Sequence, residues 1–135
     1  MNQYYPHLFE PFTIKKTTFR NHIFSAPNMM CHMDANGFPT DYMIAYYAEK
    51  AKGGAAVVTV GDTPVDHEHA PSNPRSFNLS YEALPFISEL AMAIKSHGAL
   101  ASLELNHGGL SNPPEAMGGR NPIGPVSFVR SWDGV

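Results

Sequence analysis

The sequence predicts an α/β protein built around a parallel sheet, and three observations support this prediction. Strand-like segments alternate with segments of helical periodicity, in the order hairpin, strand, helix, strand, helix, strand. A glycine stands at the end of each helical segment, shortly before the next strand. The middle strand-like segment, residues 55–60, is a continuous apolar run, as expected for a strand covered on both faces.

The chain is expected to begin with a hairpin and a short buried strand. Residues 8–14 alternate between apolar and polar, residues 15–17 suit a turn, and residues 18–20 are expected to form the second strand of the hairpin. Residues 23–26 have the composition of a buried strand. We expect Pro27 to end it, because proline has no N–H to donate to the ladder. The segment that follows, up to Pro39, has no periodicity and is expected to be a loop.

A first helix is predicted over residues 42–52, with Thr40 or Asp41 as its cap. Its core-facing side chains recur at helical spacing: Met43, Tyr47 and Ala51. Two glycines end the helix, and the apolar strand runs from there to residue 60. A polar loop follows to about residue 80.

A second helix is predicted from about residue 84 to residue 96, because Pro85 is tolerated only in a first turn. Leu84, Ile87, Ala91 and Ile94 form its expected apolar stripe. The third strand, residues 100–105, alternates and leads into the polar turn at 106–109. Residues 111–135 are rich in Pro and Gly and are expected to form a long functional loop or a tail.

Composition limits the possible functions. The chain has 135 residues and a net charge of −3, enough for one modest domain. It has no basic run, which argues against a nucleic-acid partner, and no apolar stretch of membrane-spanning length or signal-peptide pattern. The single cysteine, Cys31, excludes an internal disulfide and favours a cytoplasmic location. His67 and His69 are a weak indication of metal binding.

Polar residues gather where the predicted strands end: Asn28, Asp62, Glu104 and His107. Doubly wound sheets and barrels both bind ligands at the carboxyl ends of their strands. The first turn has no G-x-G-x-x-G, which argues against a Rossmann nucleotide site. Three strands cannot close a barrel, so the barrel interpretation makes this chain about three β/α units of one. A carboxylate at the end of a buried strand needs a partner, so Glu104 indicates either a polar ligand or a solvated edge strand.

Three segments resemble the start of the Old Yellow Enzyme family: LFEPFTIKKTTFRNHIFSAPNM, GGAAVVTVGDTPV and HGALASLELNHGG. The resemblance extends from about residue 8 to residue 125. It is greatest to the iron-sulfur branch, which includes 2,4-dienoyl-CoA reductase, trimethylamine dehydrogenase and bile-acid enoate reductases. The implied fold is the N-terminal portion of a TIM barrel that binds FMN, with the hairpin closing its bottom.

The resemblance also implies the residues that contact FMN. The first strand's end lies along the flavin, the second strand's end lies beside it, and Glu104 faces its pyrimidine side, where most of the family has Gln. His107 belongs to the family's His-x-Gly. The implied cofactor-binding residues are Ala26, Pro27, Asn28, Met29, Gly61, Asp62, Glu104 and His107.

Three departures from the family pattern qualify these expectations. Leu110 stands where most members have Arg after His-x-Gly. Met29 stands where the trimethylamine dehydrogenase branch has the Cys that links its flavin, so we expect noncovalent FMN. The family's substrate-anion pair and its proton-donating Tyr belong to later strands, so the catalytic residues are expected downstream of Val135.

The resemblance implies an NAD(P)H-dependent oxidoreductase that passes hydride from reduced flavin to an activated C=C bond. A 4Fe-4S cluster and FAD belong to the part of such proteins that this chain lacks, and the full-length protein could be a homo-oligomer. Three alternatives remain: a non-catalytic fragment with a partial flavin site, an amine dehydrogenase-like flavoprotein, and an unrelated β/α enzyme.

Overall fold

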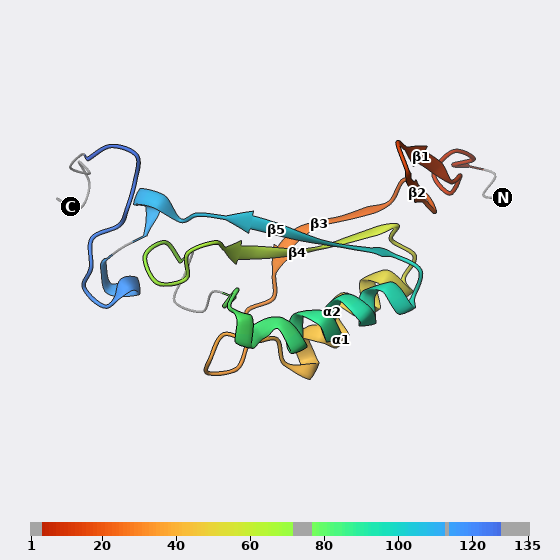
Figure 1. Ribbon diagram of the computed structural model, residues 1–135. Coiled ribbons are helices and arrows are strands. Elements are labelled where there is room, and N and C mark those ends of the chain that lie inside the picture. The colour runs from red at the N-terminus through yellow and green to blue at the C-terminus, as the bar shows by residue number, and fades with distance from the viewer. Residues whose placement is uncertain (1–3, 72–76, 113, 128–135) are drawn as a thin grey trace.

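The computed structural model describes residues 4–71, 77–112 and 114–127 (Figure 1). A small antiparallel sheet of β1 (Phe12–Ile14) and β2 (Thr17–Phe19) precedes a three-stranded sheet in the order β3-β4-β5. The hairpin was predicted from the alternating run around the two lysines, and it is confirmed. Its aromatic rings stack on the start of β3, with 5.2 Å between the ring centroids of Phe19 and Phe24.

The larger sheet is parallel throughout, as the β/α alternation predicted. It consists of β3 (Phe24–Met29), β4 (Val57–Pro64) and β5 (Leu100–Asn106). Both helices, α1 (Asp41–Lys52) and α2 (Leu84–Ser96), pack against each other on one side of this sheet (Figure 1). Right-handed crossovers between parallel strands that neighbour each other in chain order are expected to place successive helices on one side, as these two lie.

The helix boundaries follow from local chemistry. Thr40 is the N-cap of α1, and its hydroxyl accepts a hydrogen bond from the Met43 N–H. Pro85 lies in the first turn of α2, where no intrahelical N–H is required. A 3-10 turn, η1 (Tyr81–Ala83), leads into α2, and two further 3-10 turns, η2 (Gly109–Ser111) and η3 (Pro114–Met117), occupy the segment for which no element was predicted.

Two strand boundaries differ from the sequence prediction. Pro27 does not end the first strand, because β3 continues to Met29. The pairing of β3 with β4 is irregular between Ser25 and Asn28, and a residue without an N–H fits such an interruption of the ladder. β4 likewise continues past Val60 to Pro64, with an irregularity in its pairing to β5. Asn28, Gly61 and Asp62 are therefore strand residues, and not loop residues.

The core lies between the helices and the sheet. The predicted side chains of α1 are buried there, with Met43 1%, Tyr47 0% and Ala51 0% exposed, opposite Val58 of β4. On α2 the predicted stripe is only partly correct: Ile94 is buried, but Leu84 is 52% exposed. Leu90, which the stripe omitted, is buried instead. Leu84 is exposed because it lies in the first turn, beyond the region covered by α1 and the sheet.

One arginine joins the hairpin to the ends of both helices. The Arg20 guanidinium donates hydrogen bonds to the carbonyl oxygens of Ala51 at 2.6 Å, Ala55 at 2.7 Å and His97 at 2.6 Å. Beside it, the Asn21 amide donates to the Gly54 carbonyl at 2.7 Å. These carbonyls include ones that the helix ends leave without intrahelical partners, so the connection is a shared C-terminal cap.

Candidate functional site

Three strands bring sequence-predicted site residues together at one point of the sheet, around Gly61. A Cβ atom built on Gly61 would lie 2.8 Å from Glu104 Oε2, 2.8 Å from Pro27 Cβ and 3.1 Å from the Asn28 backbone nitrogen. Pro27 and Asn28 belong to β3, Gly61 to β4 and Glu104 to β5. The absence of a side chain at Gly61 is what allows the carboxylate and the irregular part of β3 to meet.

The Glu104 side chain stands on an exposed part of the sheet. Ser102, two residues earlier on the same strand, is exposed as well, whereas Leu103 packs against the core. The predicted alternation of two faces is only partly confirmed, because Ala101 and Leu105, assigned to the same face as Leu103, are exposed as well. Within residues 4–71, 77–112 and 114–127, the Glu104 carboxylate has no hydrogen-bond or ion-pair partner. Its oxygens are therefore available to accept an N–H from a ligand that lies across the strand ends.

Asn28 faces α1 with its side chain. The amide nitrogen donates to the Tyr46 hydroxyl at 2.7 Å, and the amide oxygen accepts from Lys50 Nζ. Its backbone carbonyl accepts from the Tyr47 hydroxyl at 2.6 Å. Any contact that Asn28 makes on the Gly61 side must therefore use its backbone.

The two tyrosines differ in their ionisation. The pKa of Tyr46 is lowered by its hydrogen bond with Asn28, and by the nearby Lys50 ammonium. Burial raises the pKa of Tyr47 to about 12. The Tyr47 phenol therefore remains a neutral hydrogen-bond donor well above physiological pH.

The residues next to Asn28 on β3 differ in their exposure and in the groups that they present. Ala26 and Pro27 are exposed, so this stretch presents small, rigid groups. Met29 is half-buried, and the Cys31 thiol donates to its sulfur at 3.2 Å. Because Met29 has a thioether, it cannot form the thiol-derived bond of a covalently linked flavin.

Asp62 and His107 are not part of the cluster around Gly61. Asp62 is half-buried, and its Oδ1 atom is enclosed without a hydrogen-bond partner among the described residues. His107 is exposed, and its Nδ1 accepts a hydrogen bond from the Gly109 N–H at 3.1 Å. No hydrogen bond or ion pair within the described ranges joins either side chain to Glu104. Their predicted roles remain predictions.

The loops after β4 and β5 are joined by backbone contacts. Val65 N–H donates to the Asn106 carbonyl at 2.9 Å, and Gly108 N–H donates to the Ala70 carbonyl at 3.0 Å. A Cβ on Gly108 would lie 2.4 Å from the Pro71 carbonyl oxygen. The second residue of the His-Gly-Gly sequence must therefore be glycine for packing reasons, which the sequence alone did not indicate.

Gly61 provides a direct test of this geometry. We expect Gly61→Ala to lower the free energy of unfolding by roughly 1–3 kcal/mol, the usual cost of overpacking. Glu104 can rotate away from the added methyl group, but Pro27 Cβ and the Asn28 backbone cannot. Urea denaturation would measure the change, with the exposed Ser102→Ala as the matched control. A loss equal to that of the control would contradict the close approach of the three strands.

The site fits the FMN that the family resemblance implies. It offers a glycine where a side chain would fill the space, a rigid proline beside it, and a carboxylate free to accept a hydrogen bond. Among residues 4–71, 77–112 and 114–127, no three His, Cys, Asp or Glu side chains are placed to hold a metal ion. No helix in this part of the chain is long and apolar enough to cross a membrane.

Comparison with known proteins gives a consistent picture. The sequence pattern of the NADH:flavin oxidoreductase / NADH oxidase family matches residues 7–129. The chain is 32% identical over 104 residues to an N,N-dimethylglycine/sarcosine dehydrogenase of Chromohalobacter salexigens, covering 76% of this chain and 15% of that protein. It is 27% identical over 130 residues to an NADH:fumarate oxidoreductase of Klebsiella pneumoniae, covering 95% of this chain and 14% of that protein.

Among solved structures, a 2-naphthoyl-CoA reductase in complex with 2-naphthoyl-CoA superimposes with a TM-score of 0.85 at 25% identity. The superposition covers 96% of this chain and 21% of that one. The chain thus spans about one seventh of the length of the two relatives above, and its three parallel strands and two helices are the N-terminal portion of a TIM barrel.

Proposed function

Because the chain belongs to the NADH:flavin oxidoreductase / NADH oxidase family, the Old Yellow Enzyme family, we propose that it forms part of the FMN site of an oxidoreductase. The observation that carries the proposal is the meeting of Pro27, Gly61 and Glu104 toward the carboxyl ends of three parallel strands. This is the edge at which barrels bind their ligands. The proposed FMN is noncovalent, since Met29 occupies the position of the linking cysteine.

When bound, FMN would supply hydride transfer between a nicotinamide and the substrate. Pro27 would hold the strand end rigid beside the ring system, and the backbone of Ala26 and Asn28 would approach its edge. Gly61 would leave room for the cofactor. Glu104 would accept the N–H of the flavin pyrimidine, in a charge-assisted hydrogen bond stronger than that of a neutral acceptor.

The proposed substrate carries an activated C=C bond, as an enoate, enone or dienoyl-CoA does. The names of two relatives support this choice, because fumarate is an alkene conjugated to carboxylates and 2-naphthoyl-CoA is an unsaturated thioester. The alternative is an amine dehydrogenase-like flavoprotein, which the relative named for dimethylglycine and sarcosine favours. Glu104 also favours it, since the family resemblance matches this position to one that is Gln in most members and Glu in the trimethylamine dehydrogenase-like branch.

We further propose that residues 1–135 are one part of a larger FMN-binding barrel, with the remaining strands outside this chain. The complete protein would use NADH or NADPH, and membership of the iron-sulfur branch would add a 4Fe-4S cluster and FAD. We place it in the cytoplasm, as a homo-oligomer. Asp62 and His107 remain proposed cofactor-binding residues, on the family resemblance alone.

A spectroscopic and kinetic experiment tests the function. The complete protein is expected to retain FMN after purification and to oxidise NADH or NADPH in the presence of an enone. The 135-residue chain alone is expected to give no steady enone reduction, because its sheet has open edges and its catalytic residues lie elsewhere. Turnover of dimethylglycine without enone reduction would favour the alternative. A complete protein without flavin absorbance would refute both functions.

A further inference from the structure

We propose that Lys50 and Tyr46 of α1 are positioning residues that orient Asn28 and thereby hold the end of β3 in the shape that receives the cofactor. This inference rests on the proposed function, since it presumes that this strand end binds FMN. It assigns a role to a surface of α1 that lies outside the cluster of Pro27, Gly61 and Glu104.

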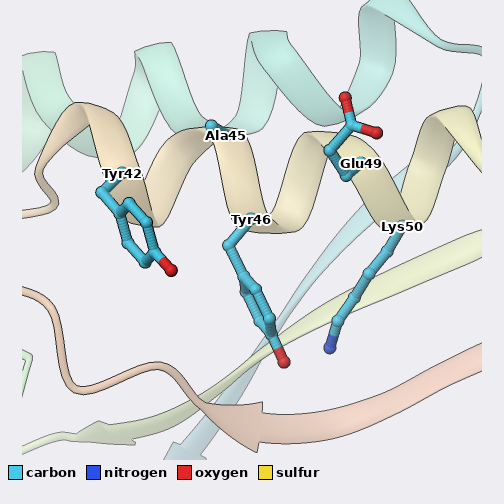
Figure 2. A pocket seen from close by; sticks show the side chains of 5 residues that line it. All are labelled: Tyr42, Ala45, Tyr46, Glu49 and Lys50. Carbon is cyan, nitrogen blue, oxygen red and sulfur yellow. The ribbon is translucent and has the colours of Figure 1, made fainter.

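The amide nitrogen, the amide oxygen and the backbone carbonyl of Asn28 each form a hydrogen bond with a side chain of α1. Tyr46 and Lys50 extend from the same face of α1 toward β3 (Figure 2). Lys50 Nζ donates to the amide oxygen of Asn28, and the amide nitrogen donates to the Tyr46 hydroxyl at 2.7 Å. The Tyr47 hydroxyl donates to the Asn28 carbonyl at 2.6 Å. Because Lys50 can only donate, the amide oxygen must face Lys50 and the amide nitrogen must face Tyr46. These two contacts fix the orientation of the Asn28 side chain.

Lys50 is itself held in place by the two aromatic rings. Its Nζ lies 4.5 Å from the ring centroid of Tyr46 and 5.4 Å from that of Tyr47. A cation at this distance from an aromatic ring is attracted to it, and the attraction is strongest away from bulk water. Lys50 is half-buried, in contrast to Lys52, which is exposed and pairs with Glu49 at 3.2 Å.

The strand needs this support because its ladder is interrupted at this point. The pairing of β3 with β4 is irregular between Ser25 and Asn28, and Pro27 has no N–H to donate. Backbone hydrogen bonds therefore define the path of the chain less completely here than along a regularly paired strand. The Asn28 nitrogen lies only 3.1 Å from the position that a Gly61 Cβ would occupy. A small displacement of Asn28 would consequently change the space between β3 and β4.

The test compares four variants of the complete protein. Lys50→Met removes the donor and the charge, and Lys50→Arg retains both. Tyr46→Phe keeps the ring but removes the hydroxyl that accepts from Asn28. Lys52→Met removes the same charge from an exposed position of the same helix, and serves as the control. The measurements are the FMN dissociation constant, the flavin midpoint potential, and amide hydrogen exchange of residues 28–30 without FMN.

We expect Lys50→Met to weaken FMN binding by about fivefold or more, which is less than the loss of a direct charge-assisted hydrogen bond, because Lys50 acts on the cofactor through Asn28. It should shift the midpoint potential and speed exchange at residues 28–30, while exchange in the core of α2 stays unchanged. Lys50→Arg should restore all three properties, Tyr46→Phe should have a smaller effect in the same direction, and Lys52→Met should match the wild type.

Three results would overturn the inference, and they are distinguishable. If the complete protein takes up FMN, but Lys50→Met and Lys52→Met give the same affinity, potential and exchange, Lys50 does not position the strand end. If Lys50→Met speeds exchange uniformly over the domain, its role is general stability. A complete protein that takes up no FMN would refute the proposed function, and this inference with it.

Discussion

Replacing Arg20 by alanine is expected to lower the free energy of unfolding by roughly 2–4 kcal/mol, the largest stability effect of any substitution considered for this chain. The side chain donates to three carbonyl oxygens, of Ala51, Ala55 and His97, from three separate places in the sequence. A hydrogen bond from a charged donor contributes about 1.5–3 kcal/mol, and the three bonds share one side chain, so their sum is not additive.

The effect is large because the carbonyls of Ala51 and His97 lie at the carboxyl ends of α1 and α2. Such ends carry partial negative charge and lack intrahelical donors. Ala51 would keep one donor, the Gly54 N–H at 3.0 Å, after the substitution. The carbonyls of Ala55 and His97 would lose the guanidinium, and of the polar connections described here only the Asn21 bond to the Gly54 carbonyl would remain.

Urea denaturation of Arg20→Ala against the wild type measures this effect, with Lys16→Ala as the control. Lys16 lies in the same hairpin and is exposed, so Lys16→Ala removes one positive charge, as Arg20→Ala does, but none of the three hydrogen bonds. Arg20→Lys should recover only part of the stability, because an ammonium cannot span the three carbonyls as the planar guanidinium does. Equal stabilities of Arg20→Ala and Lys16→Ala would show that the shared cap contributes nothing.

The elements of the fold were predictable because their signals are local. Thr40 and Pro85 mark helix starts through single-residue chemistry, and the Met43, Tyr47 and Ala51 spacing identifies the buried face of α1. The predicted ends of β3 and β4 were wrong, because the end of a strand depends on its neighbouring strands as well as on the local sequence. Whether a proline ends a strand or lies within it depends on the pairing with the neighbouring strand, and here β3 places Ala26 and Pro27 opposite the single residue Thr59 of β4.

The candidate site was predictable in part. The place of Glu104 near the carboxyl end of a strand followed from the local sequence, whereas its closeness to Gly61 depends on the registers of three strands. The roles of Arg20 and Lys50 were missed, since their partners lie between 22 and 77 residues away. A weak signal for Lys50 was present: it is four residues after Tyr46, a spacing that places both on one face of a helix.

Replacing Glu104 is expected to have the largest effect on the proposed cofactor. Glu104→Leu should weaken FMN binding about tenfold or more, because a flavin N–H would then be enclosed without an acceptor, at a cost of roughly 1–3 kcal/mol. Glu104→Gln should retain FMN, since it keeps the shape of the side chain and an acceptor oxygen. The described chain gives Glu104 no partner of its own, so neither substitution disrupts an internal hydrogen bond.

The two substitutions separate the hydrogen bond from the charge. A carboxylate beside the ring system opposes the negative charge that reduction adds, so Glu104→Gln should raise the midpoint potential. For a two-electron couple the rise is about 30 mV for each 1.4 kcal/mol of repulsion removed. Measuring FMN affinity and midpoint potential for both variants, with Ser102→Ala as the control on the same face, tests the assignment. If Glu104→Leu binds FMN as tightly as the wild type, and Glu104→Gln leaves the potential unchanged, Glu104 does not contact the flavin.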